Sequence, residues 1–386
     1  MRQARTVLST YSADAFGVCS ALYELGGMVV MHDASGCNST YSTHDEPRWY
    51  GSRSLIFISA LTEMEAIMGD DEKVIGDMVD TIGRLHPRFA AIAGTPIPMM
   101  TGCDLGAIAA EVEARSGIPC FAFGTNGMRS YLCGASEALA AIADRMTDRS
   151  ATKRKNAVNI LGATPLDFSL SGTVPSIAAI LRENGFDPIS TWAMGSSLED
   201  LRRAGEAEVN LVISGAGMKA ARLLQARFGT PIVVGTPVGT ALTGRILDAL
   251  RSSAADGRDR IVFDSFAPAA DCEAYILGEP VTSRSLAAAL HLECGADFRT
   301  VSTLEALPEL SGVLGVQDVH ASEEEALQQL LSSARLVIAD PMYRPILPAG
   351  CGFLPLPHEA FSGRIWRKRI PDLTKLDLPA FLKAGC

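Results

Sequence analysis

Cys37 has the residue type and the setting of a metal ligand or a nucleophile. It lies in the stretch "MHDASGCNSTYS" (31–42), in a Gly-Cys turn that follows the apolar run 28–31, with His32 and Asp33 close before it. A thiolate can hold a soft metal or attack an electrophile. A lone cysteine is also a small apolar residue that packs. The stretch therefore leaves three interpretations open: ligand, nucleophile or packed residue.

The nine cysteines favour metal binding or burial over a disulfide framework. We expect a cytoplasmic protein, and that compartment keeps thiols reduced. The sequence has neither a Cys-x-x-Cys pair nor a His-Glu-x-x-His motif, so an ordinary zinc site has no support. Any metal site must be assembled from distant loops or from two chains.

The composition excludes several classes of function. Of the 386 residues 47% are apolar and 20% charged, which describes a well-buried globular chain. A net charge of -10 argues against nucleic-acid binding, because phosphate contacts require clustered Lys and Arg. The basic cluster at 364–369 is too short to change this. No apolar run reaches the roughly 20 residues of a membrane span, and the N-terminal residues lack the apolar segment of a secretory signal. We expect no nucleic acid, no membrane and a cytoplasmic location.

One unit recurs along the chain: a short apolar strand, a turn with Gly, Pro or Ser, and a helical pattern. Continuous apolar runs of this kind suit parallel strands that are covered on both faces. Residues 70–85 are expected to form a helix, because apolar residues recur there at helical spacing behind Asp70 and Asp71. That apolar face consists of Val74, Met78, Ile82 and Leu85. The strand unit occurs at 88–96, 117–127, 156–164, 208–217, 229–239, 274–280 and 334–344.

This alternation predicts an α/β fold of three Rossmann-like domains with parallel sheets, which bind ligands at the carboxyl ends of their strands. Two polar stretches, at 144–160 and 251–260, suggest the boundaries. We expect an N-terminal domain over 1–150 that carries the cluster cysteines, a second domain over 151–258, and a third over 259–386 with a C-terminal tail.

The stretch "NLVISGAGMKAARLL" (210–224) has the strand, Gly-x-Gly-x-x-Ala and helix of a dinucleotide site. The acidic residue that should follow about 20 residues later is absent, because the next strand ends in Gly-Thr-Pro. We therefore interpret the turn as one that packs a helix on a strand. A P-loop motif is also absent, so ATP hydrolysis is not expected in this chain.

The N-terminal region resembles component 1 of nitrogenase and its relatives, particularly the β-type subunit. Members of that family have a His-Gly-x-x-Gly-Cys turn, then a Met-Thr-Glu segment, then a strand that leads to a cysteine and Gly-Asp-Asp. The matching segments here are 32–37, 61–69 and 102–104, and "GFLPLPHEAFSGRIW" (352–366) resembles the end of that fold. The resemblance is close over 15–110 and loose over most of the remaining chain.

The resemblance implies a subunit that pairs with a like subunit, either as an α2β2-type assembly with a homologous α-type chain or as a homodimer. It implies an iron–sulfur cluster at the interface, [4Fe–4S] or larger and P-cluster-like, that receives electrons from an ATP-dependent iron–sulfur reductase. Cys37 falls on the family's central cluster cysteine. Cys19 and Cys103 are the nearest thiols to the other two ligand positions, although neither falls on them. With those positions lost, the cluster is expected to be smaller or held mainly by the partner.

In the α-type nitrogenase subunit a cysteine and a histidine hold the catalytic cofactor. Here Ser214 stands at the cysteine's place, while His358 and Cys351 lie near the histidine's place. These three are the cofactor-binding candidates that the resemblance implies. Serine is a poor iron ligand, so we expect all three to be spectators, with the reacting site in the partner. The other cysteines are expected to pack or to lie exposed: Cys120, Cys133, Cys272, Cys294 and Cys386.

Three functions follow. The first is a subunit of a nitrogenase-like reductase that relays low-potential electrons to a small molecule such as an organic sulfur compound or a tetrapyrrole. The second is a scaffold for metallocluster assembly. The third is a nucleotide-dependent Rossmann enzyme without a cluster. A brown protein with iron and acid-labile sulfide after anaerobic purification would reject the third.

Overall fold

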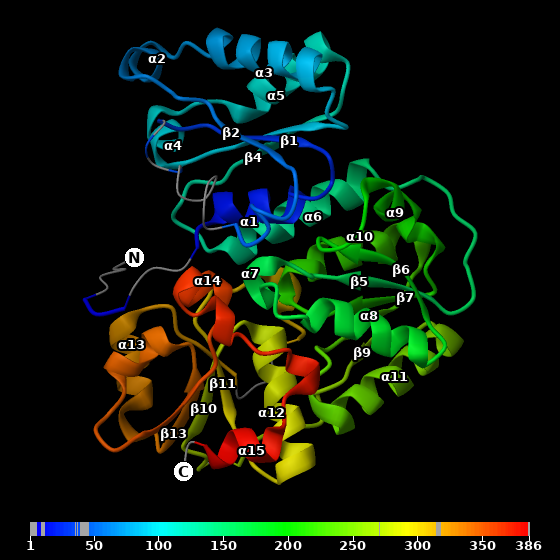
Figure 1. Cartoon of the computed structure of the whole chain (residues 1–386), viewed down its shortest axis with the longest axis vertical. Helices are drawn as coiled ribbons and strands as arrows, with labels where there is room; N and C mark the ends of the chain where they lie inside the picture. The colour runs from blue at the N-terminus through cyan, green and yellow to red at the C-terminus, as the bar shows by residue number, and fades with distance from the viewer. Residues whose placement is uncertain are drawn as a thin grey trace.

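The apolar runs form the strands of three parallel sheets in the computed structural model of the chain (Figure 1). The structure describes residues 6–8, 12–34, 36, 38, 46–269, 271–313 and 318–384. Cys37 and Cys386 lie outside the described residues. The α/β fold with parallel sheets is therefore as the sequence predicts.

The first sheet has the order β2-β1-β3-β4, and all its neighbouring strands are parallel. Alternate side chains of a strand point to opposite faces. Met28 and Val30 pack with helices α3 and α5 on one face, and Val29 and Met31 pack with α1 and α6 on the other. The bounds are α1 Asp14–Leu22, β1 Met28–Met31, β2 Leu55–Ile58, α2 Glu63–Met68, α3 Glu72–Leu85, β3 Ala90–Ala93, α4 Pro96–Thr101, α5 Leu105–Ser116, β4 Cys120–Phe123 and α6 Tyr131–Arg145.

Helix α3 confirms the helix expected over 70–85. Its buried side chains include the predicted Val74, Met78 and Ile82, together with Ile75. Leu85, the last residue of the helix, is 45% exposed. Asp71 occupies the N-cap position at the other end.

The second sheet has the order β6-β5-β7-β8-β9, again with parallel neighbours. Strands β5, β7 and β8 are fully buried, as continuous apolar strands covered on both faces should be. The bounds are β5 Ala157–Leu161, α7 Pro165–Phe168, α8 Thr173–Glu183, β6 Asp187–Trp192, α9 Leu198–Arg202, β7 Val209–Val212, α10 Met218–Phe228, β8 Ile232–Val234, α11 Gly239–Asp256 and β9 Arg260–Ile261.

The third sheet has the order β12-β11-β10-β13-β14 and is also parallel. Its first strand, β10, lies in the middle, which is the doubly wound arrangement. The bounds are β10 Ala274–Gly278, α12 Pro280–Cys294, β11 Arg299–Ser302, β12 Val319–His320, α13 Glu324–Leu330, β13 Leu336–Ala339, β14 Gly352–Pro355, α14 Glu359–Ser362 and α15 Leu378–Lys383.

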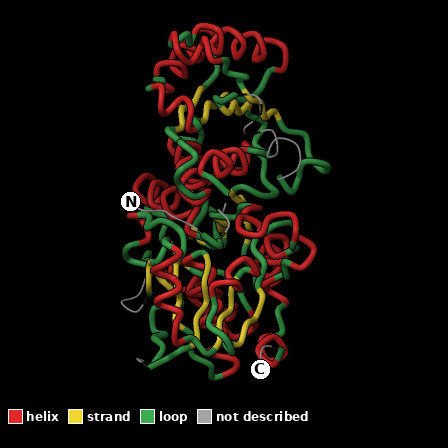
Figure 2. The backbone as a smooth tube through the Cα atoms, turned by 90° about the vertical axis from the view of Figure 1, so that its left-hand side faces the viewer, coloured by secondary structure: helices red, strands yellow, loops and turns green. Residues whose placement is uncertain are grey.

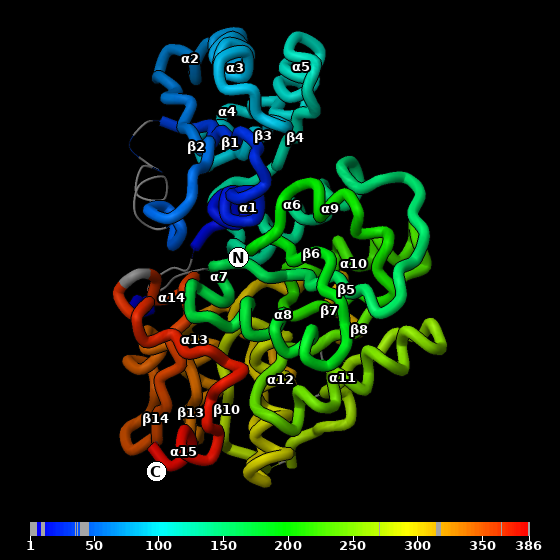
Figure 3. Tube along the Cα trace, turned by 45° about the vertical axis from the view of Figure 1, so that its right-hand side comes forward, coloured from blue at the N-terminus to red at the C-terminus, as the bar shows by residue number. Residues whose placement is uncertain are grey.

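The three sheets share one core. Its largest cluster of buried side chains contains residues from all three sheets. Helices α1 and α6 lie between the first sheet and the second (Figures 1 and 3), while Figure 2 shows the first sheet set apart from the other two along the long axis. The domain boundaries at 150 and 258 stay predictions. Within the part of the chain that the structure describes, none of the helices combines the length and apolar character that a membrane span requires.

Candidate functional site

A pocket lies where strands of the second and third sheets end. The space inside it that a water-sized molecule can occupy is about 50 Å³, enough for a few waters or a small polar group. Most of its wall is apolar, with a few acidic or imidazole side chains. These are Asp167, Glu279, Asp340 and His358, which follow strands β5, β10, β13 and β14 respectively. The location agrees with the expectation that the sheets bind ligands at their carboxyl ends.

Asp167 gathers the polar groups at the back of the pocket. The Tyr131 hydroxyl donates to its Oδ1 at 2.6 Å, and the Thr164 hydroxyl donates to its Oδ2 at 2.9 Å. The Ser214 hydroxyl lies 2.9 Å from the same Oδ2. Burial, and then the Asp167 charge, raise the pKa of Tyr131 well above its usual value, so the phenol remains a donor. The carboxylate is thus held from three separate elements.

His358 presents a buried donor beside Asp167. As the N-cap of α14, its Nδ1 accepts the backbone N–H of Ala360 at 3.3 Å, while its own backbone N–H donates to Asp340 Oδ2 at 2.8 Å. A neutral imidazole that accepts at Nδ1 carries its proton on Nε2. That atom lies 3.7 Å from Asp167 Oδ1, too far for a hydrogen bond, and it is buried without a hydrogen-bond partner among the described residues. A bound molecule could supply that partner.

Glu279 is a second buried carboxyl in the pocket wall. It is the N-cap of α12, and its Oε2 accepts the backbone N–H of Thr282 at 2.8 Å. Its Oε1 accepts the backbone N–H of Gly215 at 2.8 Å. Burial, followed by the charge of Asp167, raises the pKa of Glu279 to about 7. A carboxyl that titrates near neutral pH can exchange a proton with a bound molecule.

The glycine-rich turn after β7 packs against the neighbouring strand. A Cβ at Gly217 would lie 2.6 Å from the carbonyl carbon of Leu161, so glycine is needed for the close approach. The N–H of Gly215 is already bound by the Glu279 carboxyl. A pyrophosphate at this turn would meet a carboxylate where a dinucleotide site offers free N–H groups. The geometry therefore supports the interpretation of this turn as a packing device.

The structure places the three predicted cofactor residues in different surroundings. Ser214 is fully buried, and its hydroxyl lies 2.7 Å from the Gly162 carbonyl oxygen as well as near Asp167. Cys351 lines a separate hollow with Arg344 and Trp366. His358 offers an N–H to the pocket. Of these three residues, His358 lines the pocket between the second and third sheets, whereas Ser214 and Cys351 do not.

The predicted cluster cysteines are separated in the structure. Cys37 lies outside the described residues. Cys19 is fully buried in α1, where burial foremost and the Glu46 charge raise the pKa of its thiol. Cys19 packs with the side chains on one face of the first sheet, and Cys103 packs with those on the other. The structure therefore does not bring Cys19 and Cys103 together. Cys120 and Cys133 are buried, in agreement with packing roles.

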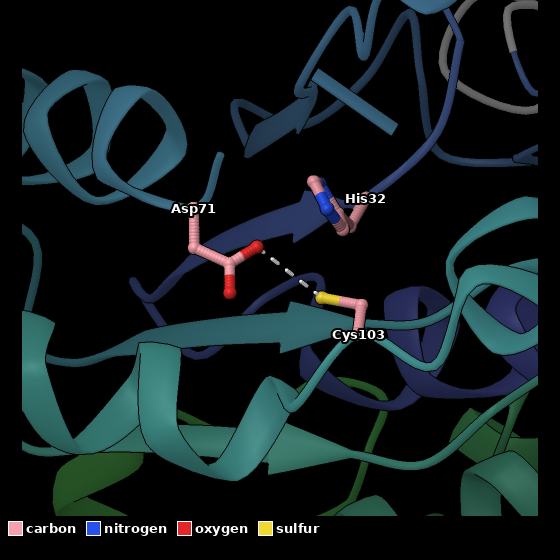
Figure 4. Close-up of side chains that lie close together, drawn as sticks. All are labelled: His32, Asp71 and Cys103. Atoms are coloured by element: carbon pink, nitrogen blue, oxygen red, sulfur yellow. Dashed lines mark hydrogen bonds between the residues drawn. The ribbon is translucent and has the colours of Figure 1, made fainter. Parts of the chain in front are cut away.

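Cys103 instead meets His32 and Asp71 (Figure 4). One potential ligand atom from each residue lies within 4.8 Å of the other two. The thiol of Cys103 donates to Asp71 Oδ1 at 3.7 Å. Burial, foremost, raises the pKa of Cys103 to about 12 and lowers the pKa of His32. In the absence of a cation, both groups therefore remain neutral at pH 7.

The acidic residues of the pocket, and Asp71 of the cluster with His32 and Cys103, were not predicted from the sequence as site residues. Glu279 and Asp340 directly follow buried strands and precede proline, and Asp71 directly precedes α3. An acidic residue at the carboxyl end of a parallel strand is a signal that could have identified the first two. Asp167 lies in "TPLDFS", where it has the appearance of an ordinary residue of a short helical turn.

The family model and the related proteins that match this chain all concern nitrogenase-like proteins. Residues 14–334 match the family model for nitrogenase component 1 type oxidoreductase. The nitrogenase iron-molybdenum cofactor biosynthesis protein NifE of Clostridium pasteurianum is 26% identical over 181 residues, which cover 46% of this chain and 38% of that protein. One of the subunits of the light-independent protochlorophyllide reductase of Prosthecochloris aestuarii is 38% identical over 96 residues, which cover 24% of this chain and 18% of that protein.

The match to these curated relatives spans less than half of their length. A solved structure of nitrogenase Cp1 at pH 6.5 superposes with a TM-score of 0.69 and covers 100% of this chain and 94% of that chain. Its sequence identity is 16%, so this likeness concerns the fold.

Proposed function

Because the chain belongs to the nitrogenase component 1 type oxidoreductases, we propose that it is a subunit of a nitrogenase-like reductase that delivers low-potential electrons to a small organic molecule. The organic sulfur compounds and tetrapyrroles named above are the substrate classes to test. The observation that carries the proposal is the mostly apolar pocket of Asp167, Glu279 and His358, in which a few polar groups converge.

In this proposal the substrate lies in this chain, although the sequence favoured a relay to a reacting site in the partner. His358 Nε2, which has no hydrogen-bond partner among the described residues, would donate to a polar acceptor on the substrate, and Glu279 would hold or release a proton near neutral pH. Reduction of an organic molecule consumes protons as well as electrons, so a buried acid beside it serves the chemistry. Ser214 acts here by holding Asp167.

We further propose that the electrons arrive through an iron–sulfur cluster at a subunit interface, either [4Fe–4S] or larger, with Cys37 as a ligand. Such a cluster would supply one-electron transfer at low potential. The partner would be a homologous α-type subunit in an α2β2-type complex, or a second copy of this chain. An ATP-dependent iron–sulfur reductase would be the electron donor. The family membership supports these proposals.

The test is to narrow the pocket without touching its polar groups. Ile370 is a part-exposed residue of the pocket wall, whereas Ile365 is 84% exposed and does not line it. In the complex with partner and reductase, Ile370→Trp should lower kcat/KM at least about tenfold, and Ile365→Trp should leave it unchanged. Electron paramagnetic resonance should show the interface cluster intact in both variants. Unchanged turnover with Ile370→Trp would instead place the substrate in the partner.

A scaffold for metallocluster assembly is the second candidate. The likeness to NifE, a cofactor biosynthesis protein by name, favours it. Metal analysis separates the two functions: a scaffold carries a metallocluster beyond the interface cluster and transfers it to an apo acceptor protein, whereas the proposed reductase retains its iron through turnover.

A further inference from the structure

We propose that His32, Asp71 and Cys103 form a binding site for a single divalent transition-metal ion of the zinc type. The inference does not rest on the proposed reductase function, because none of the three residues lines the pocket between the second and third sheets.

The three side chains converge from separate segments at the carboxyl edge of the first sheet (Figure 4). His32 directly follows β1, Asp71 precedes α3, and Cys103 lies between α4 and α5. With Zn–S of about 2.3 Å and Zn–O of about 2.0 Å, a tetrahedral ion separates sulfur and oxygen ligands by about 3.5 Å. The Cys103 sulfur and Asp71 Oδ1 are already 3.7 Å apart. Small side-chain rotations would bring all three ligand atoms around one ion.

The Asp71 carboxylate does not cap its own helix, although its N-cap position would normally engage it. An N-cap aspartate usually accepts a backbone N–H from the first turn of its helix. Asp71 makes no such side-chain bond, and Asp70 accepts the N–H of Glu72 instead. The Asp71 carboxylate is turned toward Cys103.

Ser59 orients the His32 imidazole. The Ser59 hydroxyl lies 3.2 Å from the Asp33 carbonyl oxygen and 2.9 Å from His32 Nδ1. When the hydroxyl donates to the carbonyl it accepts from Nδ1, and His32 then keeps a lone pair on Nε2 for a metal ion. Histidines that bind a metal usually donate their other ring N–H to a nearby acceptor, which fixes the tautomer and the orientation of the ring.

The ligand types select the kind of ion. One nitrogen, one oxygen and one sulfur suit Zn²⁺, Co²⁺ or Fe²⁺, whereas Ca²⁺ and Mg²⁺ prefer oxygen ligands alone. An iron–sulfur cluster would require more thiolates than the one that the described residues bring to this site. Asp71 and Cys103 are partly exposed, so an ion can reach the site and retain a fourth, exchangeable ligand.

The experiment is a cobalt titration of the full chain, purified with a chelator, desalted and kept reduced. Cobalt should bind once per chain with a thiolate-to-metal charge-transfer band, and zinc should displace it. Cys103→Ser should abolish the band. Asp71→Asn should weaken zinc binding by about 10- to 100-fold. Matched controls are Asp70→Asn and Cys294→Ser, which should bind as the unchanged chain does.

Circular dichroism and thermal unfolding would confirm that each variant is folded. Asp71 is partly exposed, so Asp71→Asn should fold and would test the proposal even if Cys103→Ser misfolds. A charge-transfer band that persists in Cys103→Ser would overturn the proposal, as would equal zinc affinity in Asp71→Asn and Asp70→Asn. Iron that arrives with acid-labile sulfide and is lost in Cys103→Ser would also overturn it, and would make Cys103 a cluster ligand.

Discussion

Two buried carboxyls, Asp167 and Glu279, lie in the pocket wall. Burial, followed by the charge of Asp167, raises the pKa of Glu279, while Asp167 is held by the Tyr131 hydroxyl and lies beside the His358 ring. A like charge in a water-poor site opposes the ionisation of Glu279. Glu279 therefore keeps a proton that an exposed glutamate would have lost.

This arrangement makes stability depend on pH. In the folded chain the pKa of Glu279 is about 7, above its ordinary value of 4.5. Between these values the folded state binds more protons than the unfolded state, so the free energy of unfolding falls as the pH rises. Glu279→Gln cannot titrate. The stability of the unchanged chain relative to the variant should fall by about 2–3 kcal/mol between pH 4.5 and pH 7 and then level off.

Urea unfolding at pH 5, 6, 7 and 8 would measure this difference. The absolute stability of Glu279→Gln is not decisive, because the amide also replaces an acceptor of the Thr282 N–H. The relevant quantity is the slope of the difference with pH. Parallel pH profiles for the two proteins would show that Glu279 has an ordinary pKa.

Cys37 is the residue on which the cluster proposal depends. In the complex with its partner, prepared anaerobically, Cys37→Ala should lose cluster iron and activity, because thiolates hold such clusters. Cys120→Ala should keep both, since the buried Cys120 thiol of β4 contributes apolar volume alone. Iron and sulfide analysis would measure the outcome. Full iron occupancy in Cys37→Ala would end its assignment as a ligand.

At the scale of elements, α1 and α6 pack with almost no space between their backbones. A Cβ at Gly134 of α6 would lie 1.8 Å from the Asp14 carbonyl oxygen, and one at Gly17 of α1 would lie 2.0 Å from the Tyr131 carbonyl oxygen. Two glycines thus allow contact of helix backbones. Because Tyr131 also holds Asp167, this packing positions the back of the pocket.

Gly134→Ala should therefore destabilise the chain by about 1–3 kcal/mol or more, because the helices must separate. Gly244→Ala is the matched control: it lies inside α11 with open space around its Cβ, and alanine there should stabilise by up to about 1 kcal/mol. Chemical denaturation would compare the two. If both substitutions left the free energy of unfolding unchanged, this would contradict the close contact between the backbones of α1 and α6.

At the scale of the whole molecule, an exposed apolar patch adjoins the proposed metal site. Helices α2 and α4 contact each other and expose side chains that a monomer would normally bury. The members are Met64 (67% exposed), Ile67 (70%), Met68 (71%), Met99 (48%) and Met100 (80%). We propose that this patch contributes to the interface with the homologous subunit or second copy.

Ile67→Glu should then weaken assembly at least about tenfold, because it places a charge in a contact that excludes water. Leu85→Glu is the control, since Leu85 is also exposed but lies at the far end of α3. Light scattering with the partner chain would report the mass of each variant. Full assembly with Ile67→Glu would show that the patch is not part of the interface. A monomer that holds a complete cluster would contradict the subunit proposal itself.

The fold class, the helix around Val74 and the family could all be predicted from the sequence. Each of these depends on short-range patterns: continuous apolar strands, residues at helical spacing, and turns such as 32–37. The same patterns supported the interpretation of the turn at Gly217 as a packing device, with which its contact with Leu161 agrees. Local patterns suffice here because a strand or a helix is specified mostly by its own residues.

Which side chains meet could be seen only once the elements were packed together. Ser214 and Asp167 are 47 residues apart in the chain, and their contact depends on how β7 packs beside β5. The resemblance made Cys19 and Cys103 candidate ligands of one cluster with Cys37, yet the first sheet separates them, and Cys103 meets Asp71 instead. The physical reason is that convergence depends on the packing of whole elements, to which each residue contributes little, so no local pattern records it.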